Sequence, residues 1–449
     1  MKKILVLGAG QSSPFLISYL LENAEANGWF VTVADRDANA AAKRVAGHPR
    51  GDAIALNAND MAILTAQIKK SDVVVNMLAP SFQHLVAWEC VQHGTHMISA
   101  SYRDQRVRDL HTDAQRADVL ILCECGLDPG IDHMSAMSLI NHVRNHGGLV
   151  EGFLSYGSGI PAPDSLSNPM KYAITWNPRN VVMAAEHGAQ YLITGQIKIV
   201  PHWQVFRRSW VVDVEGLGTM EAYPNRDSLS YKKIYGLDNA ETMIRGTLRY
   251  PGWSETWLQI VRLGLPNEEL RIPDLANRSF AEVVEMFLPR NTSGDNLAQR
   301  VANHLQISPT GHIMEKLKWL GLFSEEPTGV DGETSAEVLS HMLQKKLALG
   351  ETERDMVVLV HELEVCYPEE NNRREKVVST LIEYGEPNRF TAMSKTVGLP
   401  AAIAAKLLLT DDLPITGSHI PTHAAIYSAI LPELEAAGLT FKKSTRAMK

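Results

Sequence analysis

The sequence predicts an α/β protein with a doubly wound parallel sheet, and three observations support this prediction. Over the first 125 residues, short apolar runs typical of buried strands alternate with stretches whose apolar residues recur at helical spacing. A glycine-rich turn follows the first run, and polar residues follow several of the later runs. Because this alternation places helices on both faces of a parallel sheet, we expect the strand ends to form one polar rim where ligands bind.

The expected strands cover residues 3–7, 30–34, 53–56, 72–77, 96–99 and 119–123, and the expected helices begin at Phe15 and cover 61–68, 82–91 and 107–117. Near the end of the chain, residues 392–409 and 423–431 are also apolar at helical spacing. Helices this apolar should pack on a sheet face. We therefore expect a first domain of residues 1–132 that residues 391–449 complete.

The composition is that of an ordinary globular protein and excludes several classes of function. The 449 residues carry a net charge of −8 and show no basic block, which argues against a nucleic-acid-binding protein. The apolar runs are shorter than the ~20 residues that span a bilayer, and the N-terminal run is too short for a signal peptide. The four cysteines have no metal-type spacing, so we expect no metal site and a reducing, cytoplasmic location.

The first strand, turn and helix match the dinucleotide-binding fingerprint of a Rossmann-type domain. Gly8 permits the tight turn, and Gly10 lets the backbone approach a pyrophosphate at the helix N-terminus. Ser13 replaces the third glycine, and Asp35 ends the second strand 25 positions after Gly10. The order of strand, glycine turn, helix, strand and acid is what this fingerprint requires.

The acid at the end of the second strand bears on the choice of cofactor. A carboxylate at Asp35 would accept hydrogen bonds from the adenosine ribose and repel a 2′-phosphate, which favours NAD over NADP. Arg36 points the other way, because a guanidinium stacks on adenine or pairs with a phosphate. The expected cofactor is therefore NAD or NADP, with NAD favoured.

The stretch around residues 119–133 is the strongest further site candidate. A buried strand ends there in a turn-rich loop that carries Asp128, Asp132 and His133, and a helix is expected after His133. The alternative is a plain turn in which Asp128 or Asp132 caps that helix. Ser101, Tyr102 and Asn57 also follow strands, with a helix cap or a turn as the alternative for Ser101 and Asn57.

Residues 133–390 are expected to form a second domain with an open mixed sheet. Short strands are expected at residues 154–156, which lead into a flexible turn at 157–159, and at 172–176, 196–200, 210–214 and 247–250, with a strand pair at 355–365 and 376–384. Helical periodicity dominates residues 279–343, which predicts a helical insertion at about 266–350. Arg179, Arg226, Arg245 and Arg249 are candidates to bind a substrate carboxylate, and surface salt bridges are the alternative.

Nine stretches together resemble the saccharopine dehydrogenase family of the L-glutamate-forming type, also called saccharopine reductase. They are GAG at 8–10, SY at 101–102, GLDPGIDH at 126–133, LSYGSGIPAP at 154–163, NPMK at 168–171, WNPR at 176–179, YPNRDS at 223–228, RGTLRY at 245–250 and VGLP at 397–400. The resemblance implies a Rossmann domain, a mixed α/β substrate and dimerisation domain with an α-helical subdomain, and a homodimer.

The resemblance also implies functional residues. Substrate contacts would fall on Ser101, Tyr102, Asp128, Arg226, Thr247, Leu248 and Arg249. Cofactor contacts would fall on Gly8, Gly10, Gln11, Ser12, Ser13, Asp35, Arg36, Met77, Leu78, Ala79, Gly126, Leu127, Gly130, Ile131, Asp132, Trp176 and Arg179. Asn57 is a further cofactor-binding candidate, from its place at a strand end on the expected rim. Two positions depart from the family: Gly157 stands where fungal relatives carry a cysteine, and Asp35 stands where NADP-preferring relatives lack an acid.

The implied reaction interconverts saccharopine with L-glutamate and L-2-aminoadipate 6-semialdehyde through an imine and a hydride transfer, in lysine metabolism. The proton at the reacting nitrogen needs an acid/base group, for which Asp128 is the first candidate, Tyr102 the second and His133 the third. Two alternatives stay open. One is an imine reductase like carboxynorspermidine synthase, and the other is a regulator that binds NAD without turnover.

Overall fold

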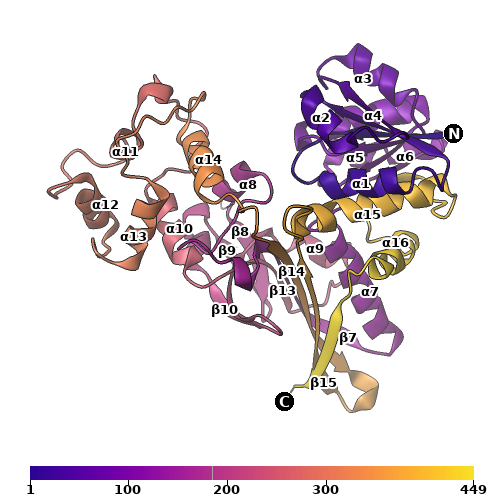
Figure 1. The fold of residues 1–449 in the computed structure, drawn as a ribbon. Coiled ribbons are helices and arrows are strands. Elements are labelled where there is room, and N and C mark those ends of the chain that lie inside the picture. Colours follow the sequence, from indigo (N-terminus) through magenta and orange to yellow (C-terminus); the bar gives the residue numbers. More distant parts are fainter. Residues whose placement is uncertain (185, 449) are drawn as a thin grey trace. The chain divides into compact units, whose positions relative to one another are not determined.

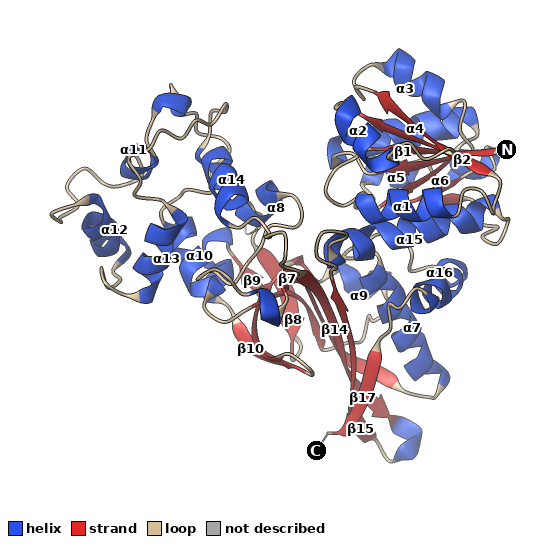
Figure 2. Ribbon diagram, viewed as in Figure 1, coloured by secondary structure: helices blue, strands red, loops and turns tan. Residues whose placement is uncertain are grey.

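The computed structural model describes residues 1–184 and 186–448, and it divides the chain into two compact units. The first unit contains Met1–Val150, Val365–Glu375 and Leu381–Lys449, and the second contains Glu151–Glu364 and Lys376–Thr380. The chain contains two sheets (Figure 2): the first lies in the first unit, and most strands of the second lie in the second unit. The expected combination of a parallel sheet with a second, mixed sheet is confirmed.

The first sheet has seven strands in the order β16-β6-β5-β4-β1-β2-β3, and its strand pairs are parallel. The strands are β1 (Lys2–Leu7), β2 (Trp29–Asp35), β3 (Gly51–Ala55), β4 (Val73–Asn76), β5 (His96–Ser99), β6 (Leu120–Leu122) and β16 (Gly417–His419). Six of them lie where the sequence predicts strands. The seventh, β16, was not predicted, because Gly-Ser-His has no apolar pattern and pairs with β6 only through its backbone.

Helices cover this sheet on both faces (Figure 1). They are α1 (Pro14–Glu22), α2 (Ala38–Val45), α3 (Met61–Ile68), α4 (Gln83–His93), α5 (Gln105–Asp109), α6 (His111–Arg116) and α15 (Ala392–Leu409). The expected helix at 107–117 is thus two short helices. One core joins side chains of α3, α4, α5 and α6 to residues such as Leu5, Val74 and Met97 of the sheet.

Helix α15, from the last part of the chain, returns to the first sheet, as expected, and packs against α1, β4 and β5. It is long and apolar enough to cross a membrane, but 78% of that window is buried inside the protein, as in the core helix of a globular domain. A Cβ at Gly398 would lie 3.0 Å from both the Cβ and the backbone N of Leu16 in α1. This glycine therefore permits the close approach of the two helices.

Two further helices belong to the first unit, α7 (Ile131–Asn145) and α16 (Ala424–Ala436), and they contact each other. The expectation that a helix begins after His133 is wrong by three residues, because α7 begins at Ile131. Asp132 and His133 lie in the first turn of α7 rather than in the preceding loop. This early start follows from the short loop, in which the backbone N–H of Ile131 donates to the Gly126 carbonyl.

The second sheet is mixed. Its path runs β10-β11-β13-β7-β14-β15-β17, with β8 pairing β12, β13 and β9 beside it. The strands are β7 (Leu149–Pro161), β8 (Ala189–Ile193), β9 (Gln196–Val200), β10 (Trp210–Val214), β11 (Gly218–Pro224), β12 (Arg226–Asp227), β13 (Thr242–Arg249), β14 (Asp355–Tyr367), β15 (Arg373–Tyr384) and β17 (Lys442–Ala447). The expected pairing of 355–365 with 376–384 is confirmed as β14 beside β15.

Two expectations about this sheet are wrong. Residues 157–159 do not form a flexible turn but continue strand β7, because β13 pairs with β7 as far as Thr247 and Gly157. Residues 172–176 do not form a strand, since only Ile174 makes an isolated bridge, with Ala348. The aromatic and β-branched residues there are buried for packing, which a propensity argument cannot distinguish from strand pairing.

The remaining helices belong to the second unit: α8 (Pro178–Val182), α9 (Ser230–Ile234), α10 (Trp253–Arg262), α11 (Phe280–Glu285), α12 (Leu297–Leu305), α13 (His312–Leu320) and α14 (Ser335–Lys346). Helices α11 to α14 confirm the helical insertion and lie together in Figure 1. Reciprocal capping boxes begin α11 at Ser279 and Glu282 and α14 at Thr334 and Glu337.

Candidate active site

The glycine turn between β1 and α1 has the shape of a phosphate-binding turn. Gly8 has a φ of +104°, and a Cβ on it would lie 3.1 Å from the Met77 carbonyl oxygen, so only glycine fits. A Cβ on Gly10 would meet nothing within 4 Å. Among the described residues, the backbone N–H groups of Gln11 and Ser12 have no acceptor. The turn thus offers free donors and open space for a pyrophosphate.

Asp35 is held beside this turn by two backbone hydrogen bonds. Its Oδ2 accepts from the Ala9 N–H at 2.7 Å, and its Oδ1 accepts from the Asp37 N–H at 2.9 Å. The carboxylate therefore lies beside the turn, as the dinucleotide fingerprint requires of the acid that contacts the adenosine ribose. Arg36 is exposed, and Arg44 donates from Nε to the Ala9 carbonyl oxygen at 3.4 Å.

The loop after β4 lies next to the glycine turn, whereas Asn57 has the contacts of an ordinary turn. The Met77 N–H donates to the Leu7 carbonyl, and the Leu78 N–H donates to Oδ1 of Asn76 at 3.2 Å. Asn57 is exposed and accepts from the Asn59 N–H at 3.1 Å at the start of α3. The Met77–Ala79 loop therefore lies beside the glycine turn. The contacts of Asn57 fit the alternative interpretation, in which it is an ordinary turn residue.

The segments after β5 and β6 lie side by side. The Glu124 N–H donates to the Ser101 carbonyl oxygen at 3.0 Å, and the Cys125 N–H donates to the Ser99 carbonyl oxygen at 2.9 Å. The Tyr102 side chain is 40% exposed. These bonds join the Ser101–Tyr102 segment to the start of the GLDPGIDH loop, so two of the predicted segments share one rim of the sheet.

The GLDPGIDH loop is closed on itself and presents Asp128. The Gly126 N–H donates to the Pro129 carbonyl at 3.0 Å, and the Asp128–Pro129 peptide bond is cis. A Cβ on Gly130, which has a φ of +150°, would lie 2.0 Å from the Gly126 carbonyl oxygen. Asp132 is buried and accepts from the Gly130 N–H at 2.5 Å, whereas Asp128 is half-exposed. Asp132 therefore shapes the loop, and Asp128 is the carboxylate that a solute can reach.

His133 is fully buried and faces Glu124, a residue that the sequence did not single out. The His133 Nε2 lies 2.8 Å from Glu124 Oε2, and the Arg103 N–H donates to Glu124 Oε1 at 3.0 Å. Burial alone would raise the pKa of Glu124, but the His133 hydrogen bond and charge, with the Arg103 N–H, hold it below the usual value. The sequence did contain a signal for Glu124, because it is an acid within an otherwise apolar run.

Arg249 in β13 is a buried guanidinium with no carboxylate partner among the described residues. Its Nη1 donates to the Ser158 hydroxyl at 3.0 Å and to the Leu248 carbonyl at 2.8 Å, and its Nε is buried without an acceptor. The guanidinium carbon lies 4.7 Å from the ring centre of Tyr172 and 5.5 Å from that of Trp253. A buried cation with free donors favours an anionic ligand.

The other residues of the second unit differ in their surroundings. Arg226 is exposed, has a φ of 49°, and makes no ion pair within the described part of the chain. Arg179 forms an ion pair with Glu268. Its contacts therefore fit the alternative interpretation, a surface salt bridge. Half-buried Thr247 lies opposite Gly157, where β13 pairs with β7, and Leu248 is fully buried. The Trp176 Nε1 lies 3.3 Å from the Tyr172 hydroxyl, and Arg245 stacks on Tyr231.

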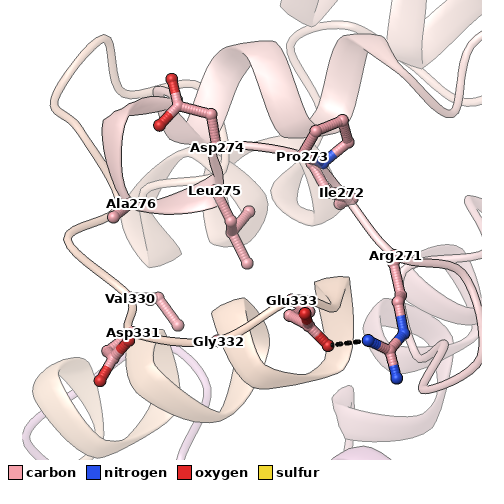
Figure 3. A pocket seen from close by; sticks show the side chains of 10 residues that line it. All are labelled: Arg271, Ile272, Pro273, Asp274, Leu275, Ala276, Val330, Asp331, Gly332 and Glu333. Atoms are coloured by element: carbon pink, nitrogen blue, oxygen red, sulfur yellow. Dashed lines mark ion pairs between the residues drawn. The ribbon is translucent and has the colours of Figure 1, made fainter.

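A pocket of about 450 Å³ lies in the helical part of the second unit, between residues 271–276 and 330–333 (Figure 3). Arg271 pairs with Glu333 at 2.6 Å at its edge. None of the sequence-predicted site residues lines this pocket.

Within the described residues, no group of three or more His, Cys, Asp or Glu side chains could hold a metal ion. Burial raises the pKa of the Cys123 thiol to about 12, so this cysteine is an unreactive thiol.

Comparisons with known proteins agree with this arrangement. Residues 4–122 match the family model described as the saccharopine dehydrogenase NADP binding domain, and residues 126–439 match the saccharopine dehydrogenase C-terminal domain. The mitochondrial alpha-aminoadipic semialdehyde synthase of Mus musculus is 32% identical over 98% of this chain and 47% of its own length. The chain thus spans about half the length of that relative.

Two fungal proteins match over their whole length. The saccharopine dehydrogenase [NADP(+), L-glutamate-forming] of Schizosaccharomyces pombe is 30% identical over 99% of both chains. The structure of apo saccharopine dehydrogenase (L-Glu forming) from Saccharomyces cerevisiae superposes with a TM-score of 0.88 and 29% identity, covering 100% of both chains. With both family models matched in order along the chain, this protein belongs to the saccharopine dehydrogenase family.

Proposed function

We propose that this protein is a saccharopine dehydrogenase of the L-glutamate-forming type. It would interconvert saccharopine with L-glutamate and L-2-aminoadipate 6-semialdehyde. The observation that carries this proposal is the buried Arg249, whose guanidinium has no carboxylate partner among the described residues. Saccharopine carries three carboxylates, whereas carboxynorspermidine carries one. A buried arginine with free donors favours the substrate with more carboxylates.

The proposed reaction needs an imine, a hydride and a proton. In the reducing direction, the amino group of glutamate attacks the aldehyde carbon, and loss of water leaves the imine. When bound at the glycine turn, a reduced nicotinamide dinucleotide would supply the hydride that the imine carbon accepts. A proton on the imine nitrogen then completes saccharopine, and the oxidative direction reverses each step.

Asp128 is our first choice for the group that exchanges this proton. It is the half-exposed carboxylate of the GLDPGIDH loop, whereas Asp132 is buried and bound to its own loop. Tyr102, which is 40% exposed on the neighbouring loop, is the second choice. His133 is fully buried against Glu124, so we assign it to supporting the loop rather than to contact with substrate. Gly157 carries no thiol, so no cysteine at that position takes part.

For the cofactor, we propose that NAD is used at least as well as NADP. The support is the position of the Asp35 carboxylate beside the glycine turn, where it would meet a 2′-phosphate as a like charge. Asp35→Asn should raise the NADP to NAD ratio of kcat/KM by about tenfold, because the repulsion is removed and the Ala9 hydrogen bond is kept. Asp37→Asn, which alters the neighbouring helix-capping carboxylate, is the matched control. An unchanged ratio in Asp35→Asn would show that Asp35 does not select the cofactor.

We further propose that the protein is a cytoplasmic homodimer. Isoleucines Ile197 and Ile199 of strand β9 are 60% and 71% exposed, and within the described residues β9 pairs with β8 alone. An exposed apolar edge strand favours association with another strand.

The four cysteines are free and buried, which suits a reducing compartment. Fractionation of cells that express the protein would test the location.

The deciding experiment is a steady-state assay of the purified protein with saccharopine and NAD, and then with saccharopine and NADP. Reduced nicotinamide is followed by absorbance, and the products are identified. Glutamate formed in equal amount to reduced cofactor is the expected result. Dinucleotide binding without turnover of saccharopine would overturn the substrate proposal and leave the oxidoreductase fold.

A further inference from the structure

A buried amide side chain spans the carboxyl ends of three adjacent strands in the first sheet. Gln83, the first residue of α4, is 1% exposed. Its Oε1 accepts from Asn76 Nδ2 at 3.1 Å and from the Ser99 hydroxyl at 2.9 Å, while its Nε2 donates to Cys123 Sγ at 3.1 Å. Asn76 ends β4, Ser99 ends β5, and Cys123 follows β6. These three strands are neighbours in the sheet order.

Two partners of Gln83 also hold the loops that follow their strands. Asn76 Oδ1 accepts from the Leu78 N–H at 3.2 Å, in the Met77–Ala79 loop beside the glycine turn. The Ser99 hydroxyl oxygen accepts from the Ser101 N–H at 3.1 Å, in the segment that carries Ser101 and Tyr102. Each of these two side chains therefore forms a hydrogen bond to Gln83 and also accepts a hydrogen bond from the backbone N–H of a loop residue.

We propose that Gln83 is a positioning residue that couples the cofactor loop at Met77–Ala79 to the substrate loop at Ser101–Tyr102. The roles of these two loops rest on the proposed function, whereas the hydrogen-bonded chain Leu78–Asn76–Gln83–Ser99–Ser101 does not. The side-chain oxygen of Gln83 joins the two halves of this chain of hydrogen bonds, because it accepts a hydrogen bond from each half. Its removal would free the side chains of Asn76 and Ser99 to turn, and both loop amides would lose a fixed acceptor.

The rival explanation is that Gln83 merely fills the core and satisfies buried polar groups. That role would affect the stability of the first unit but would not single out these two loops. Thr95 provides the comparison. It is also 1% exposed, and its hydroxyl donates to the carbonyl oxygens of Ile68 at 3.2 Å and Ser71 at 3.3 Å. It precedes β5 and lies at the opposite end of that strand from Ser99.

The test uses full-length Gln83→Leu and Thr95→Val, with amide hydrogen exchange measured by mass spectrometry on peptides covering residues 77–82 and 100–104. We expect exchange in both peptides to rise about tenfold in Gln83→Leu and to stay unchanged in Thr95→Val. The dissociation constant of the dinucleotide and the KM of saccharopine should rise together in Gln83→Leu, with kcat/KM falling about 10- to 100-fold. Gln83→Glu keeps an oxygen that accepts from both partners and should restore most of the loop protection.

Ser99→Ala serves if Gln83→Leu fails to fold, because it removes the Ser99 hydrogen bonds to Gln83 and Ser101 but leaves Asn76 bonded to Gln83 and Leu78. It should loosen residues 100–104 and leave residues 77–82 protected. Equal loosening of both loops in Gln83→Leu and Thr95→Val, in step with their unfolding temperatures, would overturn the coupling. If the wild-type protein does not turn over saccharopine, the proposed function fails, while hydrogen exchange and dinucleotide titration still decide the role of Gln83.

Discussion

Two buried charged side chains of this protein, Glu124 and Arg249, have opposite surroundings. Glu124 is enclosed by partners, with the His133 ring on one oxygen and the Arg103 N–H on the other. Arg249 is enclosed by aromatic rings and a hydroxyl but by no carboxylate of the described residues. A paired buried charge stabilises a loop, whereas an unpaired one is a cost that ligand binding can offset.

The first prediction concerns Glu124. Because its pKa is lowered in the folded state, the folded protein binds fewer protons than the unfolded one between the two pKa values. Its contribution to stability is therefore present above the usual pKa of a glutamate and is lost as the pH falls through the lowered value. Glu124→Gln should lower the free energy of unfolding by about 1–3 kcal/mol at neutral pH, and the difference from wild type should shrink below about pH 4.

Urea unfolding followed by circular dichroism across this pH range would measure the effect. Glu25→Gln, at an exposed position of the same unit, is the control and should track the wild type. A stability difference that stays constant down to pH 2 would show that folding does not lower the pKa of Glu124.

The second prediction concerns Arg226. This exposed guanidinium has no ion-pair partner in the described chain, so its removal costs the fold little. Arg226→Ala should raise the KM of saccharopine roughly 10- to 100-fold, because a charge-assisted hydrogen bond to a carboxylate is lost. Arg290→Ala removes another exposed arginine from the same unit and should leave that KM unchanged. Equal KM values in the two variants would mean that Arg226 does not hold the substrate.

At the scale of elements, the chain brings a segment from its far end against its first helix. Helix α15 packs on α1, although about 370 residues separate them in the sequence. The contact is close because Gly398 has no side chain, and the same α1 begins at the glycine turn. The packing of α15 therefore supports the element that would hold the pyrophosphate.

The third prediction tests this contact. Gly398→Ala should destabilise the protein by about 1–3 kcal/mol, because its Cβ would meet the Leu16 backbone at 3.0 Å. Helix propensity alone predicts the opposite sign, a gain of about 1 kcal/mol. Thermal unfolding separates the two outcomes. Gly10→Ala, whose Cβ would meet no atom within 4 Å, should leave stability unchanged but weaken dinucleotide binding, because that Cβ would occupy the pyrophosphate approach.

At the scale of the whole molecule, each unit carries part of the proposed chemistry. The first holds the glycine turn, Asp35 and the rim formed by three strand ends, and the second holds the arginines and the exposed β9 edge. Such a division matches a reaction in which the cofactor binds a parallel sheet and a separate domain selects the substrate.

The fourth prediction concerns association. If β9 forms the dimer interface, replacing both Ile197 and Ile199 with glutamate should shift the protein to a monomer at micromolar concentration, because charges would be buried without partners. Light scattering coupled to size-exclusion chromatography measures the mass directly. Met286→Glu, at a residue 48% exposed in the helical subdomain, should remain dimeric. A dimer in both variants would place the interface elsewhere.

Much of the fold was predictable because its signals are local. The apolar period of each strand and helix, the need for glycine at Gly8 and Gly130, and the helical insertion all depend on neighbouring residues. The errors have the same origin. Residues 157–159 and 172–176 carry local signals for a turn and a strand, but pairing with β13 and burial against other elements decided otherwise.

By itself, the sequence determined the order of strands and helices, the dinucleotide fingerprint with its acid at Asp35, and the motifs that a saccharopine dehydrogenase shares. Only the tertiary structure decided that Glu124 faces His133, that Gln83 joins three strand ends, and that Arg249 lies buried without a carboxylate. The physical reason is that these contacts depend on how separate elements pack together. Gln83 and Cys123 lie 40 residues apart and Glu124 and His133 lie 9 apart, and no local period in the sequence records which of them meet.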